Sequence, residues 1–258
     1  MRIAPDRVGA VTTQVAVIGA GGRMGRAACE AVEAADGLSL VARIGRGDDL
    51  AALVDAGAEV AVELSVPDAA PDHVAYCVEH GVHAVVGTTG WDASRLARLE
   101  QQLAAAPEVG VLIAPNFAVG AVLAMRFAAA AAPFFESVEI VELHHPDKLD
   151  APSGTARHTA AMVAEARRTA GTQASPDATA RSVEGARGAD IDGVRVHSVR
   201  LRGLVAHEEV LLGGVGEQLT IRHDSFDRAS FMPGVLLGVR TVASRPGLTV
   251  GLENYLDL

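Results

Sequence analysis

The chain has 258 residues, of which 49% are hydrophobic and only 21% are charged, so it can form a packed core and is not a disordered chain. The formal net charge of −10, with no basic run to offset it, argues against nucleic acid as a partner. No apolar run reaches the ~18 residues that a membrane span needs, and Cys29 and Cys77 lack the spacing of a redox or metal site, which indicates reduced thiols in a cytoplasmic protein without a metal.

Strands and helices alternate along residues 14–115. Residues 1–13, ahead of them, lack the long apolar core of a signal peptide and are expected to be an N-terminal extension. Short apolar runs predict strands over 14–20, 38–44, 59–65, 82–87 and 110–115. Helical spacing predicts helices over 22–35, 48–56, 68–80 and 92–106. This alternation predicts βαβ units, and therefore an α/β fold with a Rossmann-like, doubly wound parallel sheet.

The pattern changes after residue 116. An Ala-rich helix over 118–132, a strand over 137–145 and a helix over 154–170 are followed by a long loop over 171–192. Three strand-like runs, 194–201, 207–213 and 217–223, predict a mixed or antiparallel sheet. A last helix over 227–244 and a tail close the chain, and we expect this helix to return to the first domain. The two expected domains are residues 1–118 with 228–258, and an α+β domain at 119–227.

A glycine-rich loop, GAGGRMG, stands between the first expected strand and the first helix. A dinucleotide loop needs this context, because glycines let the backbone approach a pyrophosphate and the helix N-terminus offers it N–H groups. The spacing departs from GxGxxG and also gives GxxGxxG, and an ordinary tight turn is the alternative. Arg23 could neutralise a phosphate or be a solvated side chain. The candidate cofactor contacts here are Gly19, Ala20, Gly21, Gly22, Arg23, Met24 and Gly25.

Two later strands end in further candidate cofactor loops, GTTG and APNF. Ligands of doubly wound sheets bind beyond the carboxyl ends of the strands, which is where both loops are expected. An ordinary turn remains the alternative for GTTG. The candidate cofactor contacts in these loops are Gly87, Thr88, Thr89, Ala114, Pro115, Asn116 and Phe117.

The segment EIVELHHPDKLDAPSGTA, residues 139–156, holds a helix start suited to an anion. Ser153 is a natural N-cap. Gly154 and Thr155 then supply N–H groups at a helix N-terminus, where a carboxylate binds well.

Proton carriers lie just before that helix start. His144 titrates near neutrality and can carry a proton in either direction, and Lys148 adds a charge and a proton. Glu142 stands two residues before His144, so it shares a strand face with it and could orient the imidazole. The alternative is a plain strand and capped helix with a surface histidine pair. That alternative does not explain why a cation, proton carriers and an anion site crowd together.

This segment resembles the signature of the dihydrodipicolinate (4-hydroxy-tetrahydrodipicolinate) reductase family, E-[I/V]-x-E-x-H-x-x-x-K-x-D-x-P-S-G-T-A, and matches it at every position. GAGGRMG, GTTG and APNF are similar to the cofactor motifs of the family in order and spacing. The resemblance continues through residues 185–213 and 221–240, so it covers essentially the whole chain after residue 13. Its closeness suggests an actinobacterial-type member.

The resemblance implies NAD(P)H-dependent reduction of 4-hydroxy-tetrahydrodipicolinate to tetrahydrodipicolinate in the diaminopimelate and lysine pathway. It implies that His144 is the proton donor and acceptor and that Lys148 is a proton donor. It also implies a homotetramer joined through the sheet of the substrate domain, residues 119–227. The substrate, a small cyclic dicarboxylate, is expected to contact Thr89, His145, Ser153, Gly154 and Thr155.

The end of the second expected strand bears on the choice of cofactor. Members that resemble this chain often carry an acidic residue where Gly45 stands, and here no carboxylate follows until Asp48 and Asp49, at the expected start of the next helix. Arg46, and also Arg43, could contact a 2′-phosphate, or could be solvated. We therefore predict at least a modest preference for NADPH, with NADH also accepted.

Two other functions stay open from the residues alone. A different two-domain NAD(P)-dependent amino-acid dehydrogenase should lack the HHxxxK and PSGT segments, which are present. A non-catalytic dinucleotide-sensing module need not keep His144 or Lys148.

Overall fold

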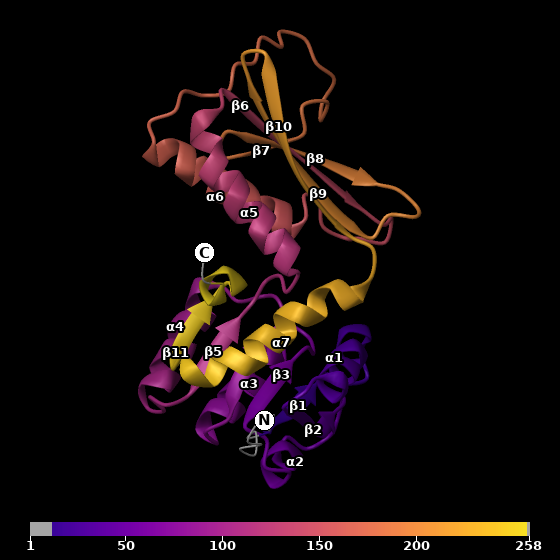
Figure 1. Cartoon of the computed structure of the whole chain (residues 1–258), viewed down its shortest axis with the longest axis vertical. Coiled ribbons are helices and arrows are strands. Elements are labelled where there is room, and N and C mark those ends of the chain that lie inside the picture. The colour runs from indigo at the N-terminus through magenta and orange to yellow at the C-terminus, as the bar shows by residue number, and fades with distance from the viewer. Residues whose placement is uncertain (1–11, 257–258) are drawn as a thin grey trace, which may run out of the picture. The chain divides into compact units, whose positions relative to one another are not determined.

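The computed structural model describes residues 12–256, which form two compact units (Figure 1). One unit holds the described residues up to Phe117 and those from Phe231 onward, and the other spans Ala118–Ser230. These boundaries differ by a few residues from the expected domains, 1–118 with 228–258 and 119–227. The expected extension at 1–13 lies mostly outside the described residues. Among the helices described, none is both long and apolar enough to cross a bilayer.

The first unit is built on a six-stranded sheet in which every pairing is parallel, with the order β11-β5-β4-β3-β1-β2. This confirms the Rossmann-like sheet. Its strands are β1 (Thr13–Ile18), β2 (Leu38–Ile44), β3 (Val60–Glu63), β4 (His83–Val86), β5 (Gly110–Ile113) and β11 (Gly247–Val250). Its helices are α1 (Arg23–Ala34), α2 (Ala51–Asp55), α3 (Ala70–Glu79), α4 (Ala93–Ala104) and α7 (Met232–Thr241).

Small aliphatic side chains fill the core of this unit on both sides of the sheet. On one side, Ile18 packs with Val74 of α3 and Leu99 of α4. α1 and α7 contribute the buried residues Val32 and Val235. The inner strands β1, β3, β4 and β5 are buried on both faces and read as continuous apolar runs, which is why the sequence identified them.

The C-terminal tail corrects the expectation for the end of the chain. Residues Gly247–Val250 are not irregular but form β11, which pairs in parallel with β5. The last helix is shorter than the expected 227–244, since short 3-10 turns, Arg228–Phe231 and Val242–Ser244, flank α7. Four residues are too few for an alternating pattern to identify a strand, and β11 depends on the edge that β5 offers.

The second unit has a five-stranded mixed sheet, β10-β9-β6-β8-β7, in which only β6 and β8 pair in parallel. This confirms the mixed sheet expected for the second, α+β domain. Two helices, α5 (Val119–Ala131) and α6 (Gly154–Thr169), cover one face of it (Figure 1). The strands are β6 (Ser137–His144), β7 (Ala189–Ile191), β8 (Val194–Arg200), β9 (Ala206–Gly214) and β10 (Glu217–Ser225).

The strand β7 lies within the stretch expected to be a loop, 171–192. It forms a tight hairpin with β8 through Asp192 and Gly193, which both have positive φ, 50° and 86°. An Asp-Gly pair is a common signal for this turn. The strand was missed because it has only three residues.

Burial alternates along β6 and leads directly to the candidate site. Val138 and Ile140 face the helices and belong to the core of the second unit. Glu142 continues the same row and is fully buried. A carboxylate therefore occupies a core position at the end of this strand, where burial requires that its charge be compensated.

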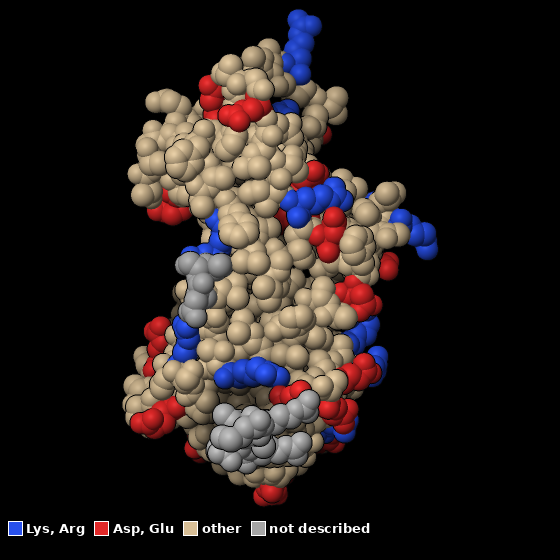
Figure 2. Space-filling model, in the orientation of Figure 1, with Lys and Arg blue, Asp and Glu red and all other residues tan. Residues whose placement is uncertain are grey.

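Charges on the surface are mixed. On the face that Figure 2 shows, Lys and Arg side chains are interspersed with Asp and Glu side chains over the described residues.

Candidate active site

The carboxylate of Glu142 and the ring of His144 meet at the end of β6. His144 Nδ1 lies 2.5 Å from Glu142 Oε2, and the histidine side chain is 13% exposed. The orienting contact expected between these residues is thus present. The ring of His144 therefore lies near the surface of the second unit, and Glu142 binds it through Nδ1.

Arg200, at the end of β8, is the second partner of Glu142. Its guanidinium donates from Nη1 to Oε2 at 2.8 Å and from Nη2 to Oε1 at 2.7 Å. Burial raises the pKa of Glu142, but hydrogen bonds to His144, Arg200 and Ser198 outweigh it and lower the pKa to about 2. Glu142 is therefore ionised at neutral pH. Sequence reasoning missed Arg200, and its only signal was its place at the end of a strand.

The start of α6 is tied to the same carboxylate. Ser153 is the N-cap, since its Oγ accepts a hydrogen bond from the backbone N of Ala156 at 3.1 Å. The backbone N of Ser153 donates to Glu142 Oε1 at 3.2 Å. Ser153 is buried, whereas Gly154 is exposed and Thr155 partly exposed. The accessible residues of this helix start are thus Gly154 and Thr155.

Lys148 lies in the turn between β6 and α6. Its Nζ is 2.7 Å from Asp150 Oδ1, and its side chain is 22% exposed. Burial raises the pKa of Asp150, but hydrogen bonds from Lys148 and the backbone of Gly154 outweigh it and lower the pKa. Lys148 and the backbone of Gly154, at the start of α6, therefore both bind the carboxylate of Asp150. His145 lies at the end of β6 and is partly exposed.

The glycine loop between β1 and α1 is tightly folded. Gly19 has φ +82°, and a Cβ there would lie 2.6 Å from the carbonyl oxygen of Leu64. A Cβ on Gly25 would lie 2.1 Å from the carbonyl oxygen of Gly19, so only glycine allows this approach of helix and loop. By contrast, a Cβ on Gly21 would meet no atom within 4 Å, and both Gly21 and the N-cap Gly22 are exposed. This open backbone at a helix N-terminus fits a dinucleotide pyrophosphate.

The other residues of the loop fix its position or lie at its rim. The backbone N atoms of Gly19 and Ala20 both donate to the carbonyl oxygen of Ile44, at 2.8 and 3.1 Å, which ties the loop to the end of β2. Arg23 is exposed and Met24 is partly exposed.

The GTTG and APNF motifs meet in the first unit. A Cβ on Gly87 would lie 2.6 Å from Cε2 of Phe117. Thr88 Oγ1 is buried and has no hydrogen-bond partner among the described residues, so a bound group could use this hydroxyl. Thr89 and Pro115 are exposed, Asn116 is partly exposed, and Ala114 and Phe117 are buried.

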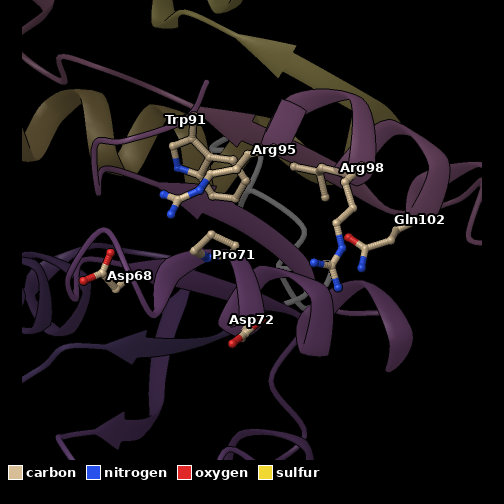
Figure 3. Close-up of a pocket in the computed structure, with 8 residues that line it drawn as sticks. Asp68, Pro71, Asp72, Trp91, Arg95, Arg98 and Gln102 are labelled. Carbon is tan, nitrogen blue, oxygen red and sulfur yellow. The ribbon is translucent and has the colours of Figure 1, made fainter. Parts of the chain in front are cut away.

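Two side chains that the sequence did not single out hold the GTTG loop. Trp91 Nε1 donates to the carbonyl oxygen of Thr88 at 3.0 Å, and Arg95 Nη1 donates to those of Gly90 at 2.8 Å and Pro67 at 3.0 Å. Figure 3 shows both side chains at a cavity of about 210 Å³ lined by residues of α3 and α4. The loops after β3 and β4 are thus fixed to each other.

The end of β2 corrects one expectation. Asp48 does not belong to the next helix, which begins at Ala51. Its Oδ2 accepts a hydrogen bond from the backbone N of Gly45 at 2.7 Å, so a carboxylate does stand beside Gly45. The side chain of Arg43 is paired with Glu33 of α1, at 2.5 Å, while Arg46 is exposed. Of the two arginines, Arg46 remains the candidate for a 2′-phosphate.

Family models match almost the whole described chain. "Dihydrodipicolinate reductase, N-terminus" matches residues 13–117, and "Dihydrodipicolinate reductase, C-terminus" matches residues 120–256. The chain belongs to the dihydrodipicolinate reductase family. The C-terminal family model also includes residues 231–256, which fold with the first unit.

Relatives within the dihydrodipicolinate reductase family are close. The chain is 63% identical over 245 residues to 4-hydroxy-tetrahydrodipicolinate reductase of Streptomyces coelicolor, which covers 95% of this chain and 98% of the relative. It is 62% identical over 248 residues to that of Nocardia farcinica, covering 96% and 100%. A dipicolinate-bound dihydrodipicolinate reductase from Paenisporosarcina sp. TG-14 is 38% identical, with a TM-score of 0.85 and coverage of 95% and 100%.

Within residues 12–256, no group of three His, Cys, Asp or Glu side chains is placed to hold a metal ion.

Proposed function

We propose that the protein reduces 4-hydroxy-tetrahydrodipicolinate to tetrahydrodipicolinate with NAD(P)H, as a step of the lysine and diaminopimelate pathway. The observation that carries this proposal is the pairing of Glu142 with His144 beside Lys148 and the start of α6. The proposal is supported by 63% identity to a relative that bears the name of this reductase.

The first unit is proposed to bind the cofactor. Within the loop Gly19–Gly25, the exposed backbone at Gly21 to Arg23 would hold the pyrophosphate at the N-terminus of α1, and the loops at Gly87–Thr89 and Ala114–Phe117 would hold the remainder. When bound, the cofactor supplies a hydride for ring C4 of the substrate. Exposed Arg46 supports a preference for NADPH, and the carboxylate of Asp48 limits that preference.

The second unit is proposed to bind the substrate through its two carboxylates. Gly154 and Thr155 would hold one of them at the N-terminus of α6, with Lys148 adding a positive charge. His145 is proposed as a further substrate contact of this unit, and Thr89 as a contact that the first unit contributes. Ser153 would contribute to this site by capping the N-terminus of α6. A dipicolinate-bound member of the family supports a flat dicarboxylate as the ligand.

Proton delivery is proposed for His144 and Lys148. Reduction at ring C4 leaves electron density on the C3 and nitrogen side of the substrate, and a proton must reach it. Glu142 holds His144 through Nδ1, which leaves Nε2 to exchange the proton. Lys148 would supply or replace a proton and stabilise the negative charge that accompanies the transfer.

The deciding test is cofactor oxidation at 340 nm. Purified protein should oxidise NADPH or NADH only when a source of 4-hydroxy-tetrahydrodipicolinate is present. Turnover with oxaloacetate and ammonia, without turnover of the cyclic substrate, would instead indicate an amino-acid dehydrogenase. Cofactor binding with no turnover of either would indicate a sensing module.

A homotetramer joined through the second unit is also proposed. The face of its sheet opposite α5 and α6 carries Val141, Leu143 and Leu211, which are partly exposed. A second copy would cover these side chains. Light scattering at micromolar concentration should give a tetramer mass, and a Leu211→Arg variant should lower it; a monomer mass for the unaltered protein would refute the proposal.

Cytoplasmic location is proposed on the basis of the cysteines. Cys29 and Cys77 are both buried and unpaired, which suits a reducing compartment. Cell fractionation checks this proposal.

A further inference from the structure

A second buried carboxylate lies opposite Glu142. Glu208 of β9 and Glu142 of β6 are directly paired in the antiparallel register of these strands. Side chains at such positions share one sheet face, about 5 Å apart at Cβ. Both residues are buried, with 7% exposure for Glu208 and none for Glu142. Two carboxylates thus occupy neighbouring core positions beneath the start of α6.

The two carboxylates have unequal partners. Glu142 is paired with Arg200, His144 and the backbone N of Ser153. Glu208 has a single hydrogen-bond partner, Thr159, and its Oε2 is buried with none among the described residues. Two adjacent buried carboxylates do not both ionise unless each is compensated, so Glu208 is the one that retains a proton. Burial raises the pKa of Glu208 to about 7, with Thr159 lowering it and Glu142 raising it.

Thr159 connects Glu208 to the first turn of α6. Its Oγ1 lies 2.6 Å from Glu208 Oε1 and 3.0 Å from the carbonyl oxygen of Thr155. A hydroxyl has one proton to donate. When Glu208 is protonated, it can donate to Thr159, which then donates to Thr155. When Glu208 is ionised, Thr159 must donate to Glu208, and the bond to the carbonyl of Thr155 is lost.

We propose that Glu208 is a positioning residue, whose proton, relayed through Thr159, holds the first turn of α6 in the state that binds the substrate carboxylate. The inference rests on the proposed function, because it assumes that Gly154 and Thr155 hold that carboxylate. Ionisation of Glu208 opposes binding in two ways. It withdraws a hydrogen bond from the first turn, and it adds a negative charge below an anion site.

The other ionisable groups around Glu208 are few. Glu142 faces it from β6 and raises its pKa, whereas His158 of α6 lowers its pKa. His223 of β10 is its partner in register on the other side. α5, which also packs on this sheet, carries Arg126 as its one ionisable residue. None of these replaces the missing partner of Oε2.

The sign of the effect follows from linkage. A dianionic ligand favours the protonated form of Glu208, so its affinity should be highest below the pKa and fall as the pH rises through about 7. Binding near pH 7 should therefore be accompanied by proton uptake at Glu208.

The experiment measures the Kd of pyridine-2,6-dicarboxylate by calorimetry on the full-length protein, between about pH 6 and pH 8.5. In the unaltered protein, affinity should fall about fivefold across this range through Glu208, a typical size for such coupling. Glutamine has nearly the shape of glutamate and can still donate a hydrogen bond to Thr159. The Glu208→Gln variant should therefore bind pyridine-2,6-dicarboxylate without this decline in affinity. Thr159→Val removes the hydroxyl that links Glu208 to Thr155, so it should bind the ligand more weakly already at pH 6 and show a smaller decline with pH, while Thr159→Ser should restore both.

These outcomes separate the inference from the proposed function. A role of Glu208 in packing alone would change the melting temperature of the variants and leave their pH profiles superimposed on that of the unaltered protein, which would overturn the inference. Absence of dipicolinate binding in every form would instead refute the proposed substrate site. Because Thr159→Val and Thr159→Ser leave Glu208 in place, they test the relay even if Glu208→Gln folds poorly.

Discussion

The ring of His144 is bound through Nδ1 to an ionised carboxylate, that of Glu142, at 2.5 Å. A carboxylate with a pKa of about 2 can only accept a hydrogen bond at neutral pH, so Nδ1 must carry the proton of this contact. The tautomer of His144 is thereby fixed, and Nε2 is the nitrogen that can gain and lose a proton.

The proposed proton carriers can be removed singly. His144→Ala and Lys148→Ala should each lower kcat by about 10²–10⁴-fold, which is the usual contribution of a general acid or base. The Kd of NADPH should hardly change, because both residues belong to the second unit. Asp150→Asn, which alters the carboxylate that Lys148 and the backbone of Gly154 share but leaves both proton carriers in place, should cost less. Unchanged kcat in both alanine variants would remove these residues from the mechanism.

Thr155 can be tested with a ligand that resists reduction. Pyridine-2,6-dicarboxylate should compete with substrate, and Thr155→Val should raise its inhibition constant by about tenfold, the value of one lost hydrogen bond to a charged group. Thr169→Val, at the other end of α6, is the matched control, because its hydroxyl bonds only to the exposed side chain of Glu165. Equal inhibition constants for the Thr155 variant and the unaltered protein would place Thr155 outside the site.

Acid should destabilise the protein partly through Glu142. Its folded pKa, about 2, lies below its ordinary value, so its contribution to the free energy of unfolding is complete above about pH 4.5 and is lost as the pH falls toward 2. Glu142→Gln should lower that free energy by about 3 kcal/mol at neutral pH and show a weaker decline in acid. Urea unfolding at several pH values measures both, with exposed Glu136→Gln as control. Parallel acid profiles would contradict this account.

The cofactor preference depends on two charges at the end of β2. Arg46→Ala should lower kcat/KM for NADPH by about tenfold and leave that for NADH nearly unchanged, since only NADPH has a 2′-phosphate. Asp48→Asn should act in the opposite direction and favour NADPH. The ratio of kcat/KM for the two cofactors is the measurement. A strong preference for NADH that Arg46→Ala leaves intact would show that Arg46 does not contact the cofactor.

Arg167 should be a large contributor to the stability of the second unit. Its buried guanidinium donates to the carbonyl oxygens of Ala132, Phe135, Glu136 and Gln173, at 2.7–3.2 Å. Arg167→Lys cannot reach them all and should lower the free energy of unfolding by roughly 3 kcal/mol. The neighbouring Arg168→Ala removes only an exposed ion pair with Glu165 and should cost under about 1 kcal/mol. Similar losses for both variants would disprove this role.

Local patterns were sufficient for much of this protein. The apolar runs of the first unit identified β1, β3, β4 and β5 because parallel strands buried on both faces need them, and they identified the partly buried edge strand β2 as well. The glycine loop followed from its place between a strand and a helix, and Ser153 from the preference of N-caps for hydroxyls. The link between Glu142 and His144 followed from their spacing along one strand. Each of these rests on neighbours within a few positions of the chain.

Tertiary structure decided the partners that lie far apart in sequence. Arg200 reaches Glu142 across 58 positions, and Thr159 reaches Glu208 across 49. Such pairs depend on the order and register of strands, which local propensity does not encode. The edge strand β11 was missed for the same reason, since it forms only against β5. The sequence thus determined which chemical groups the site contains, whereas the sheet register decided which of them are charged, paired and able to exchange a proton.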